Sequence, residues 1–386
     1  MKKILPVFFV TFLLFSCSTT EKQSLPEVVR YDGATISSVR EFVQSIEVVK
    51  LDHQDSITIG GWNTIQQQDS SFYIGDRQGI GQIYRFNRQG HFLNSIGKTG
   101  RAPGEYQNLT DFYISDTANQ IYIQSSPDFR LYLYNKQGDF IQQRHNPINA
   151  KSLTKKGDNF WWYAGHDNTQ QVERVLYADS SLNMIRKFLP LETKIISVTG
   201  DPAFTSWKDN RYLIITMDPF IYKIDGDSLQ SIVHFDFGKH NITDSFWKSE
   251  NWMEAFTRLN NNGFFSFRNF FINDDYSITA FTFQMGDTEL QSSFVYAIKN
   301  LKTNRWDWVC HKVNSPHDQM PNLKESGLDC FSRMKGFTQD GKLMLFLYAH
   351  ELELLKAEDK ALIQNPELLE NTDPEMDMFI LLCTMK

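Results

Sequence analysis

Three charged side chains lie within eight residues of one another in a stretch rich in turn-forming residues. Lys98, Arg101 and Glu105 offer two cations and a carboxylate, which can recognise a sugar or a peptide through charge-assisted hydrogen bonds. Loops commonly carry such binding groups. In a structural interpretation, the glycines and the proline between them shape a crossover, and Glu105 accepts hydrogen bonds from backbone amides. The turn-forming residues favour the structural role, and ligand binding by this trio is the site hypothesis.

Other reactive groups are scattered along the chain. The sequence has no Gly-x-Ser-x-Gly nucleophile elbow, and its nine histidines form no HxH or HExxH motif. His311, His317 and Asp318 make the closest polar grouping, whereas Asn273-Asp274-Asp275 is typical of a hairpin turn. We therefore assign no catalytic residue and no metal ligand.

The N-terminus predicts export. Lys2 and Lys3 precede an apolar run that ends at Ser16-Cys17, a pattern typical of a bacterial lipoprotein signal peptide over residues 1–16. The run is shorter than the roughly 20 residues that span a bilayer. Cleavage leaves Cys17 as a lipidated N-terminus whose acyl chains, such as palmitate, hold the protein on a membrane. With an ordinary secretory signal, Cys17 would be incidental. Residues 17–40 are interpreted as the lipidated N-terminus and tether.

Charge and cysteine content limit the partners. The chain has 386 residues with 39 Lys+Arg against 46 Asp+Glu, and removing Lys2 and Lys3 with the signal changes the net charge from −7 to −9. This acidity argues against nucleic acid as a partner. Cys310, Cys330 and Cys383 are the remaining cysteines. Both a Cys310–Cys330 disulfide and three free thiols agree with an export compartment.

Short alternating apolar segments separated by turns predict an all-β domain over residues 41–386. Two apolar stretches occur a second time further along the chain. The stretch that begins at Phe72 matches one 49 residues later at Ile121, and the stretch that begins at Ile83 matches one 48 residues later at Leu131. Both contain an Asn-basic-Gln-Gly turn, in which Gly90 or Gly138 supplies a positive φ. A repeat of this length with about four strands indicates a β-propeller blade, and weaker echoes give six blades.

The remaining segments predict two helical insertions and a closing strand. One helix begins at Thr243 or Asp244 and ends near Asn260, and the other covers about residues 351–364. Because an open ring exposes unpaired edges, we expect residues 44–51 and 378–384 to share the last blade.

Two more groups have structural and functional interpretations. The aromatic groups Trp161-Trp162-Tyr163 and Trp306-Asp307-Trp308 can stack on sugars, but they more often fill the wedge between blades. Asp76 follows an apolar triplet and is interpreted as a turn cap.

The segment from Ile96 to Tyr106, followed by Asp111-Phe112, resembles the Gly-x-Gly-Pro-Gly-Glu-Tyr…Asp-Phe signature of the six-bladed β-propeller lipoproteins of the Bacteroidetes. These are related in shape to NHL-repeat and TolB-like propellers. The resemblance is close over about residues 40–145, with Ala102 where the family often has Gly. It implies the fold and an envelope location, and it transfers no catalytic residues.

Together these features predict an outer-membrane lipoprotein propeller that binds a glycan, a peptide or an envelope protein without catalysis. Ser18 after Cys17 favours the outer membrane, and the side of that membrane is left open. One alternative is a hydrolase or lyase acting in the central channel, with Ca²⁺ or Zn²⁺ held by ligands from several blades. The other is a structural role in an envelope complex. No further cofactor is expected.

Overall fold

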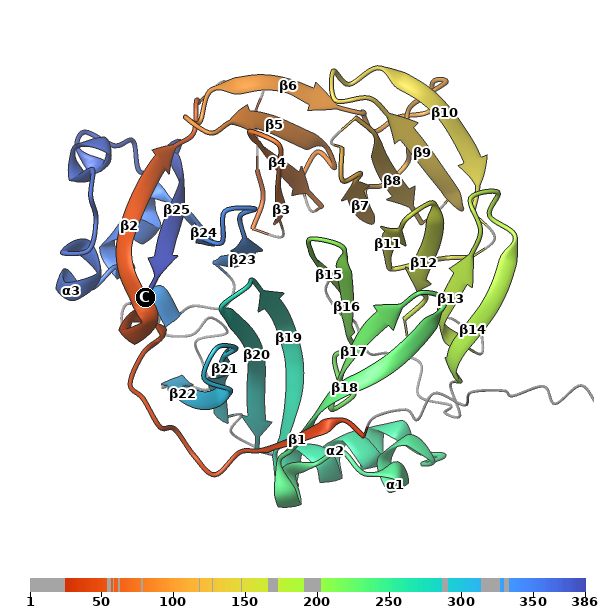
Figure 1. Cartoon of the computed structure of the whole chain (residues 1–386), viewed down its shortest axis with the longest axis vertical. Helices are drawn as coiled ribbons and strands as arrows, with labels where there is room; N and C mark the ends of the chain where they lie inside the picture. The colour runs from red at the N-terminus through yellow and green to blue at the C-terminus, as the bar shows by residue number, and fades with distance from the viewer. Residues whose placement is uncertain are drawn as a thin grey trace, which may run out of the picture.

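Six β-sheets form a ring in the computed structural model (Figure 1). Five sheets have four strands and one has five. The structure describes residues 25–53, 57, 59–61, 63–77, 79–117, 119–126, 128–146, 148–165, 173–190, 203–286, 291–313, 327–329 and 333–386. The predicted six-bladed β-propeller is confirmed.

Each sheet is one blade, and one edge strand of each blade lies nearest the centre of the ring. From the centre outward, blade 1 comprises β3 (Asn63–Gln68), β4 (Ser71–Asp76), β5 (Ile83–Asn87) and β6 (Phe92–Ile96). Blade 2 comprises β7 (Asp111–Ile114), β8 (Ile121–Ser125), β9 (Arg130–Tyr134) and β10 (Phe140–His145). Blade 3 comprises β11 (Ser152–Lys156), β12 (Asn159–Tyr163), β13 (Glu173–Ala178) and β14 (Met184–Pro190). Blade 4 contains β15 (Phe204–Trp207), β16 (Asn210–Ile214), β17 (Phe220–Asp225) and β18 (Ser228–Asp236). Blade 5 contains β19 (Phe264–Ile272), β20 (Tyr276–Met285), β21 (Gln291–Asn300) and β22 (Arg305–Val313).

Blade 6 is built from both ends of the chain and closes the ring. It contains β23 (Met334–Phe337), β24 (Leu343–Tyr348) and β25 (Met378–Met385), with β2 (Val43–Lys50) as its outer strand. β2 pairs antiparallel with β25 from Val43–Met385 to Lys50–Phe379, apart from a register shift near Ser45. The predicted closing blade is therefore confirmed.

Apolar wedges fill the spaces between blades. The buried side chains form one cluster at each of the six blade junctions. Trp161 and Trp162 show how one strand serves two wedges: both are fully buried, and Trp162 packs toward blade 2 while Trp161 packs toward blade 4. Successive strand residues point to opposite faces, so each blade presents apolar groups on both sides. The structural interpretation of these tryptophans is confirmed.

Near the centre, polar side chains of one blade bond to the next blade. No β-ladder joins neighbouring blades in the described chain, so individual hydrogen bonds such as these provide polar links around the ring. They include Gln66 Nε2 to Phe112 O (2.9 Å), Ser152 Oγ to Asp111 Oδ2 (2.7 Å), Arg211 Nε to Lys155 O (2.7 Å), Thr205 Oγ1 to Phe270 O (2.6 Å), Asn273 Nδ2 to Gly341 O (2.9 Å) and Lys335 Nζ to Asn63 O (3.2 Å).

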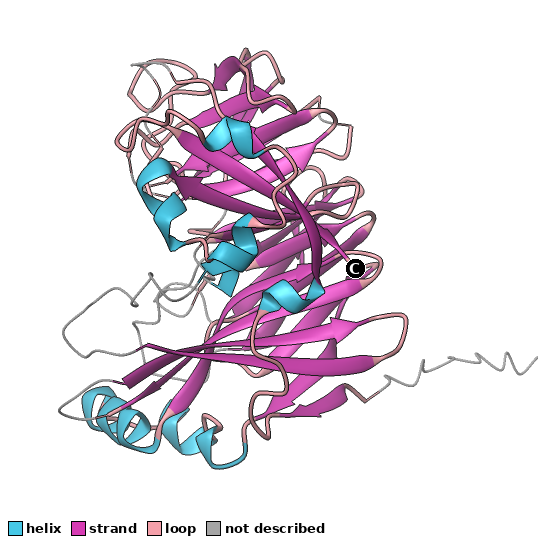
Figure 2. Cartoon of the chain, turned by 90° about the vertical axis from the view of Figure 1, so that its left-hand side faces the viewer, coloured by secondary structure: helices cyan, strands magenta, loops and turns pink. Residues whose placement is uncertain are grey.

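The helical insertions are more broken than predicted. The first contains two helices, α1 (Asp244–Trp247) and α2 (Trp252–Asn262), because the Asn251 side chain accepts a hydrogen bond from the Glu254 amide and starts a new helix. In place of one helix over residues 351–364, the chain forms a 3₁₀ turn at Ala349–Leu354 and α3 (Ala357–Lys360). The carboxylate of Asp359 caps the Lys356 amide and separates them. Figure 2 shows the helices gathered mainly on one side of the ring.

The segment assigned to the tether contains a strand. β1 (Glu27–Arg30) pairs in parallel with β18 and becomes the fifth strand of blade 4. Its Glu27 carboxylate accepts hydrogen bonds from Lys299 Nζ (2.6 Å) and Trp306 Nε1 (2.8 Å) of blade 5. Ordered structure thus begins before residue 41, and a 3₁₀ turn at Val39–Phe42 leads into β2.

The repeated turn glycines have a second role beyond their backbone angle. Gly90 and Gly138 have φ of 89° and 91°, as predicted. A Cβ on Gly90 would lie 2.0 Å from the carbonyl oxygen of Lys50 on blade 6, and one on Gly138 would lie 2.5 Å from that of Ser95 on blade 1. Only glycine permits this close approach between the outer strands of adjacent blades.

We expect Gly90→Ala to lower the free energy of unfolding by about 2 to 4 kcal/mol, because it adds overpacking at the closing seam to the cost of positive φ. Gly226→Ala is the matched control: Gly226 occupies the corresponding turn of blade 4 with φ of 57°, and a Cβ at this position would have no atom within 4 Å. It should cost only about 1 kcal/mol. Chemical denaturation of both variants measures the difference, and equal losses would contradict a steric role for the seam.

Candidate functional site

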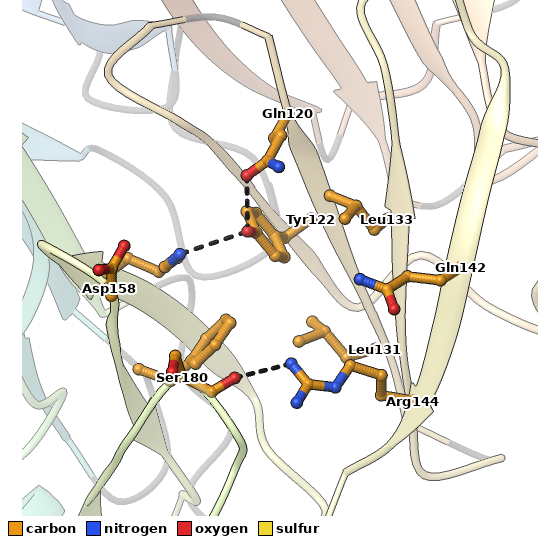
Figure 3. Close-up of a pocket in the computed structure, with 10 residues that line it drawn as sticks. Gln120, Tyr122, Leu131, Leu133, Gln142, Arg144, Asp158 and Ser180 are labelled. Atoms are coloured by element: carbon orange, nitrogen blue, oxygen red, sulfur yellow. Dashed lines mark hydrogen bonds between the residues drawn. The ribbon is translucent and has the colours of Figure 1, made fainter.

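A pocket of about 230 Å³ lies between blades 2 and 3 (Figure 3). Asp158 and Ser180 belong to the β11–β12 and β13–β14 turns, and Gln120 directly precedes β8. All three lie at the end of the blades where the hairpin turns are short. These turns belong to the face of the ring opposite the long connections that contain α1 and α2.

The two walls differ in character. Blade 2 supplies the larger wall: Gln120, Tyr122, Leu131, Leu133, Gln142 and Arg144. Blade 3 supplies the facing residues: Lys155, Asp158, Phe160 and Ser180. Strand alternation explains the composition, because every second residue of β9 and β10 points into the space between blades.

Lys155 is the central charged group of the pocket. Its Nζ lies 4.7 Å from the ring centroid of Tyr122 and 4.8 Å from that of Phe160. It also donates a hydrogen bond of 3.3 Å to the Tyr122 hydroxyl, which in turn donates to Gln120 Oε1 at 2.8 Å. Cation–π attraction and this hydrogen-bond chain fix the position of the ammonium.

A second cation bridges the pocket. Arg144 Nη1 donates a 2.8 Å hydrogen bond to the carbonyl oxygen of Ser180, across the junction from blade 2 to blade 3 (Figure 3). Asp158 is exposed and is the one carboxylate among the lining residues, which include no histidine. The lining thus favours binding of a polar, anionic group.

Arg211 lies behind the pocket and links three blades. Its side chain is only 1% exposed, and its Nε donates to the carbonyl oxygen of Lys155 at 2.7 Å. Its Nη2 lies 2.8 Å from Asp116 Oδ1 and 3.3 Å from the Tyr113 hydroxyl, both on the blade 2 side. By holding β11 and blade 2 together, Arg211 sets the separation of the pocket walls.

The predicted trio Lys98, Arg101 and Glu105 lies in a different place, the crossover from blade 1 to blade 2. Glu105 accepts a hydrogen bond from the Ala102 amide at 2.9 Å, and its carboxylate lies 3.6 Å from Lys98 Nζ. The Ala102 hydrogen bond, followed by the charge of Lys98, lowers the pKa of Glu105. Arg101 is exposed. Glu105 thus has the backbone-capping contact of the structural interpretation, and ligand binding by the trio stays a prediction.

The crossover packs outward and not over the central channel. Tyr134 of β9 donates to the carbonyl oxygen of Gly104, and a Cβ on Gly104 would lie 2.9 Å from the ring of Phe140 on β10. Tyr106 is fully buried and donates to the carbonyl oxygen of Gly81 at 2.8 Å. These contacts attach the crossover to blade 1 and to the outer strands of blade 2, and none of its residues lines the blade 2–3 pocket.

Two acidic residues near this crossover have structural partners. Asp76 accepts hydrogen bonds from the amides of Gly60, Gly79 and Ile80, which confirms turn capping. Asp111 accepts from Ser152 Oγ and from the Leu153 amide. Complete burial raises the pKa of Asp111, and these two hydrogen bonds oppose the rise.

The metal and cysteine candidates are placed only in part. Asn273-Asp274-Asp275 forms the β19–β20 turn, in which Asn273 Oδ1 accepts from two following amides. Within the described ranges no three His, Cys, Asp or Glu side chains group closely enough to hold a metal ion. Cys310 and Cys383 are free thiols, and burial raises the pKa of Cys383 to about 12. Cys17, His317, Asp318 and Cys330 lie outside the described residues.

Sequence reasoning missed every residue of the pocket. Tyr122, Leu131 and Leu133 appear in the repeat only as apolar strand positions, and Lys155 belongs to a Lys-Lys-Gly-Asp segment typical of a hairpin turn. The one usable signal is that Lys155 follows Leu153 by two residues, which places both on the same face of β11.

The fold and the pocket define a six-bladed β-propeller with a polar pocket between two blades. The family model described as a domain of unknown function, DUF4934, matches residues 28–383, and the chain belongs to this family. A search of curated protein sequences gave no match.

Solved structures share the fold at low sequence identity. A putative exported protein from Bacteroides fragilis superposes with a TM-score of 0.72 at 18% identity, over 93% of this chain and 99% of that one. A member of the DUF4221 family from Bacteroides vulgatus gives a TM-score of 0.55 at 11% identity, over 89% and 99%. Among the described residues, the structure contains no helix of sufficient length and apolar character to span a membrane.

We expect Arg211→Met to lower the free energy of unfolding by about 3 kcal/mol, because it leaves buried carbonyl groups without a donor. Arg186→Met is the control, since the Arg186–Asp227 pair is 50% exposed on both sides and should contribute less than about 1 kcal/mol. Denaturant titration compares the variants. A loss as small as that of the control would contradict a bridging role for Arg211.

Proposed function

We propose that this propeller is an envelope-anchored, non-catalytic binding module that holds a polar group of a glycan or peptide in the blade 2–3 pocket. The observation that carries the proposal is the position of Lys155, fixed beside two aromatic rings in a polar pocket. Rigid strands supply both walls, so the site is preorganised for a ligand.

The chemistry of the lining supports binding over hydrolysis. Glycoside hydrolysis ordinarily requires two carboxyl groups facing each other across the bond. Asp158 is the single carboxylate of the lining, and no histidine accompanies it to act as a base. The lining therefore offers groups that hold a ligand and lacks a pair that would transfer protons.

We further propose that the protein is anchored in the outer membrane through lipid on Cys17. The signal-peptide pattern of residues 1–16 supports the anchor, and Ser18 at the following position supports the outer membrane. The exported character stated for the B. fragilis structural relative agrees with this location. Kinship with NHL-like lipoprotein propellers is part of the same proposal.

The anchor is tested by Cys17→Ser. We expect the native protein to incorporate labelled palmitate and to fractionate with the outer membrane, because the acyl chains partition into lipid. The variant should lose the label and leave the membrane fraction. Labelling of the variant, or an unlabelled native protein, would contradict the lipid anchor while leaving the pocket proposal untouched.

The pocket is tested by filling it. Gln142→Trp, on the exposed outer strand β10, should block the pocket without disturbing the core. Gln143→Trp is the matched control, because the neighbouring side chain points to the opposite face of the strand.

Thermal unfolding of the purified full-length protein in detergent is measured against neutral and acidic mono- and disaccharides and short peptides. A ligand at 100 times its dissociation constant adds about 2.7 kcal/mol and should raise the midpoint by at least about 2 °C. We expect Gln142→Trp to abolish the shift and Gln143→Trp to keep it. A shift that survives in Gln142→Trp, or no shift with any ligand, would overturn the pocket as the binding site.

A further inference from the structure

Lys155 has aromatic neighbours but no carboxylate partner. No Asp or Glu oxygen in the described ranges lies within 4.0 Å of its Nζ, whereas Lys187, Lys299 and Lys342 each pair with a glutamate at 2.6 to 3.3 Å. Aromatic faces attract a cation but do not neutralise it. The pocket therefore presents a fixed positive charge whose counterion can come from a ligand.

Arg144 adds a second cation on the facing wall. It donates one hydrogen bond to the Ser180 carbonyl oxygen, and a guanidinium group carries five donors in a planar fork that matches a carboxylate. Against these two cations the lining has one carboxylate, the exposed Asp158, and the charge of Arg144 also acts on the Asp179 carboxylate next to Ser180. Lys155 is thus the cation of the lining on which the ligand charge is expected to act most strongly.

The rest of the lining fits a ring with hydroxyl groups. The side chains of Leu131, Leu133 and Phe160 are only 2%, 5% and 2% exposed, so the accessible part of the lining is polar and includes the exposed amides of Gln120 and Gln142. The hydroxyl groups of a saccharide can bond to these amides while an acidic group of the same ligand meets the cations. The volume of about 230 Å³ restricts the pocket to a small group.

We infer that the pocket binds a carboxylate-bearing saccharide, a hexuronic acid residue, with the carboxylate at Lys155 and Arg144 and the hydroxyl groups at the amides of Gln120 and Gln142. This inference rests on the proposed binding function of the pocket and names its ligand class. Two contributions are separable: the cations recognise the carboxylate, and the amides of Gln120 and Gln142 recognise the hydroxyl groups.

The ligand class is tested with the wild-type protein. Isothermal titration of the full-length protein in detergent compares methyl glucuronide, methyl glucoside and acetate. We expect the glucuronide to bind about tenfold or more tightly than the glucoside, because the charge-assisted hydrogen bonds are lost with the carboxylate. Acetate should bind more weakly than the glucuronide, and added salt should weaken glucuronide binding.

Each alternative result has a defined meaning. Equal affinity for glucuronide and glucoside would overturn the acidic ligand class and leave a neutral saccharide site. Acetate binding as tight as that of the glucuronide would overturn the saccharide and leave a simple carboxylate site. Absence of glucuronide binding would overturn the inference. The proposed function would fail only if, in addition, none of the saccharides and peptides of the thermal unfolding panel gave a midpoint shift that Gln142→Trp abolishes.

The Lys155→Met variant tests whether Lys155 recognises the carboxylate of the ligand, and Lys156→Met is its control. Lys156 is adjacent but directed to blade 4, where its Nζ donates to the Ile224 carbonyl oxygen at 2.8 Å. We expect Lys155→Met to weaken glucuronide binding by about tenfold and to leave glucoside binding unchanged. Lys156→Met should keep wild-type affinity for both. Unchanged glucuronide affinity in a folded Lys155→Met variant would overturn the role of Lys155. If that variant does not fold, the comparison of glucuronide with glucoside on the wild-type protein still tests the ligand class.

Discussion

The pairing of β2 with β25 is the constraint on which the rest of the structure depends. It joins the two ends of the chain in one blade, and only then does every blade have a neighbour on both sides. No backbone ladder links one blade to the next in the described chain, so the ring depends mainly on side chains: six apolar wedges and a set of polar bonds near the centre, with single backbone hydrogen bonds such as Phe267 N to Thr216 O. An open ring would expose two of the wedge faces to water. Glycine at the outer turns lets adjacent blades approach within backbone contact, as at Gly90 beside Lys50.

The pocket is a consequence of how one wedge ends. Between blades 2 and 3 the apolar cluster includes Leu131, Leu133 and Phe160, and beside these residues the pocket is lined by Lys155, Arg144 and two glutamines. Arg211 holds the walls from behind, because it bonds to the Lys155 carbonyl oxygen and to Asp116 at the same time. The site is thus made of strand positions whose geometry the blades determine, in contrast to a loop site that orders on binding. This rigidity favours selection of a ligand by shape and charge.

The N-terminal segment joins the ring more closely than a simple tether does. β1 adds a parallel fifth strand to blade 4, and Glu27 reaches Lys299 and Trp306 of blade 5. The sequence does not indicate this strand, because four residues are too few to display an alternating pattern. The helical insertions show a similar limit. Asn251 and Asp359 cap new helices inside stretches with continuous helical periodicity, and a cap depends on where a side chain folds back.

The sequence by itself determined the features that depend on neighbours along the chain. These are the strand alternation, the turn glycines with positive φ and the capping role of Asp76, which local hydrophobic period and turn chemistry specify. The number of blades followed from the repeat, and the closing strand followed from the need to leave no open edge in the ring. Only the tertiary structure decided which charged residues meet. Lys98 and Glu105 are near in sequence and pair with each other at a crossover, whereas Tyr122, Arg144, Lys155 and Phe160 come from two blades and converge on a pocket. Their convergence depends on the angle and register between blades, and no spacing in the sequence encodes it.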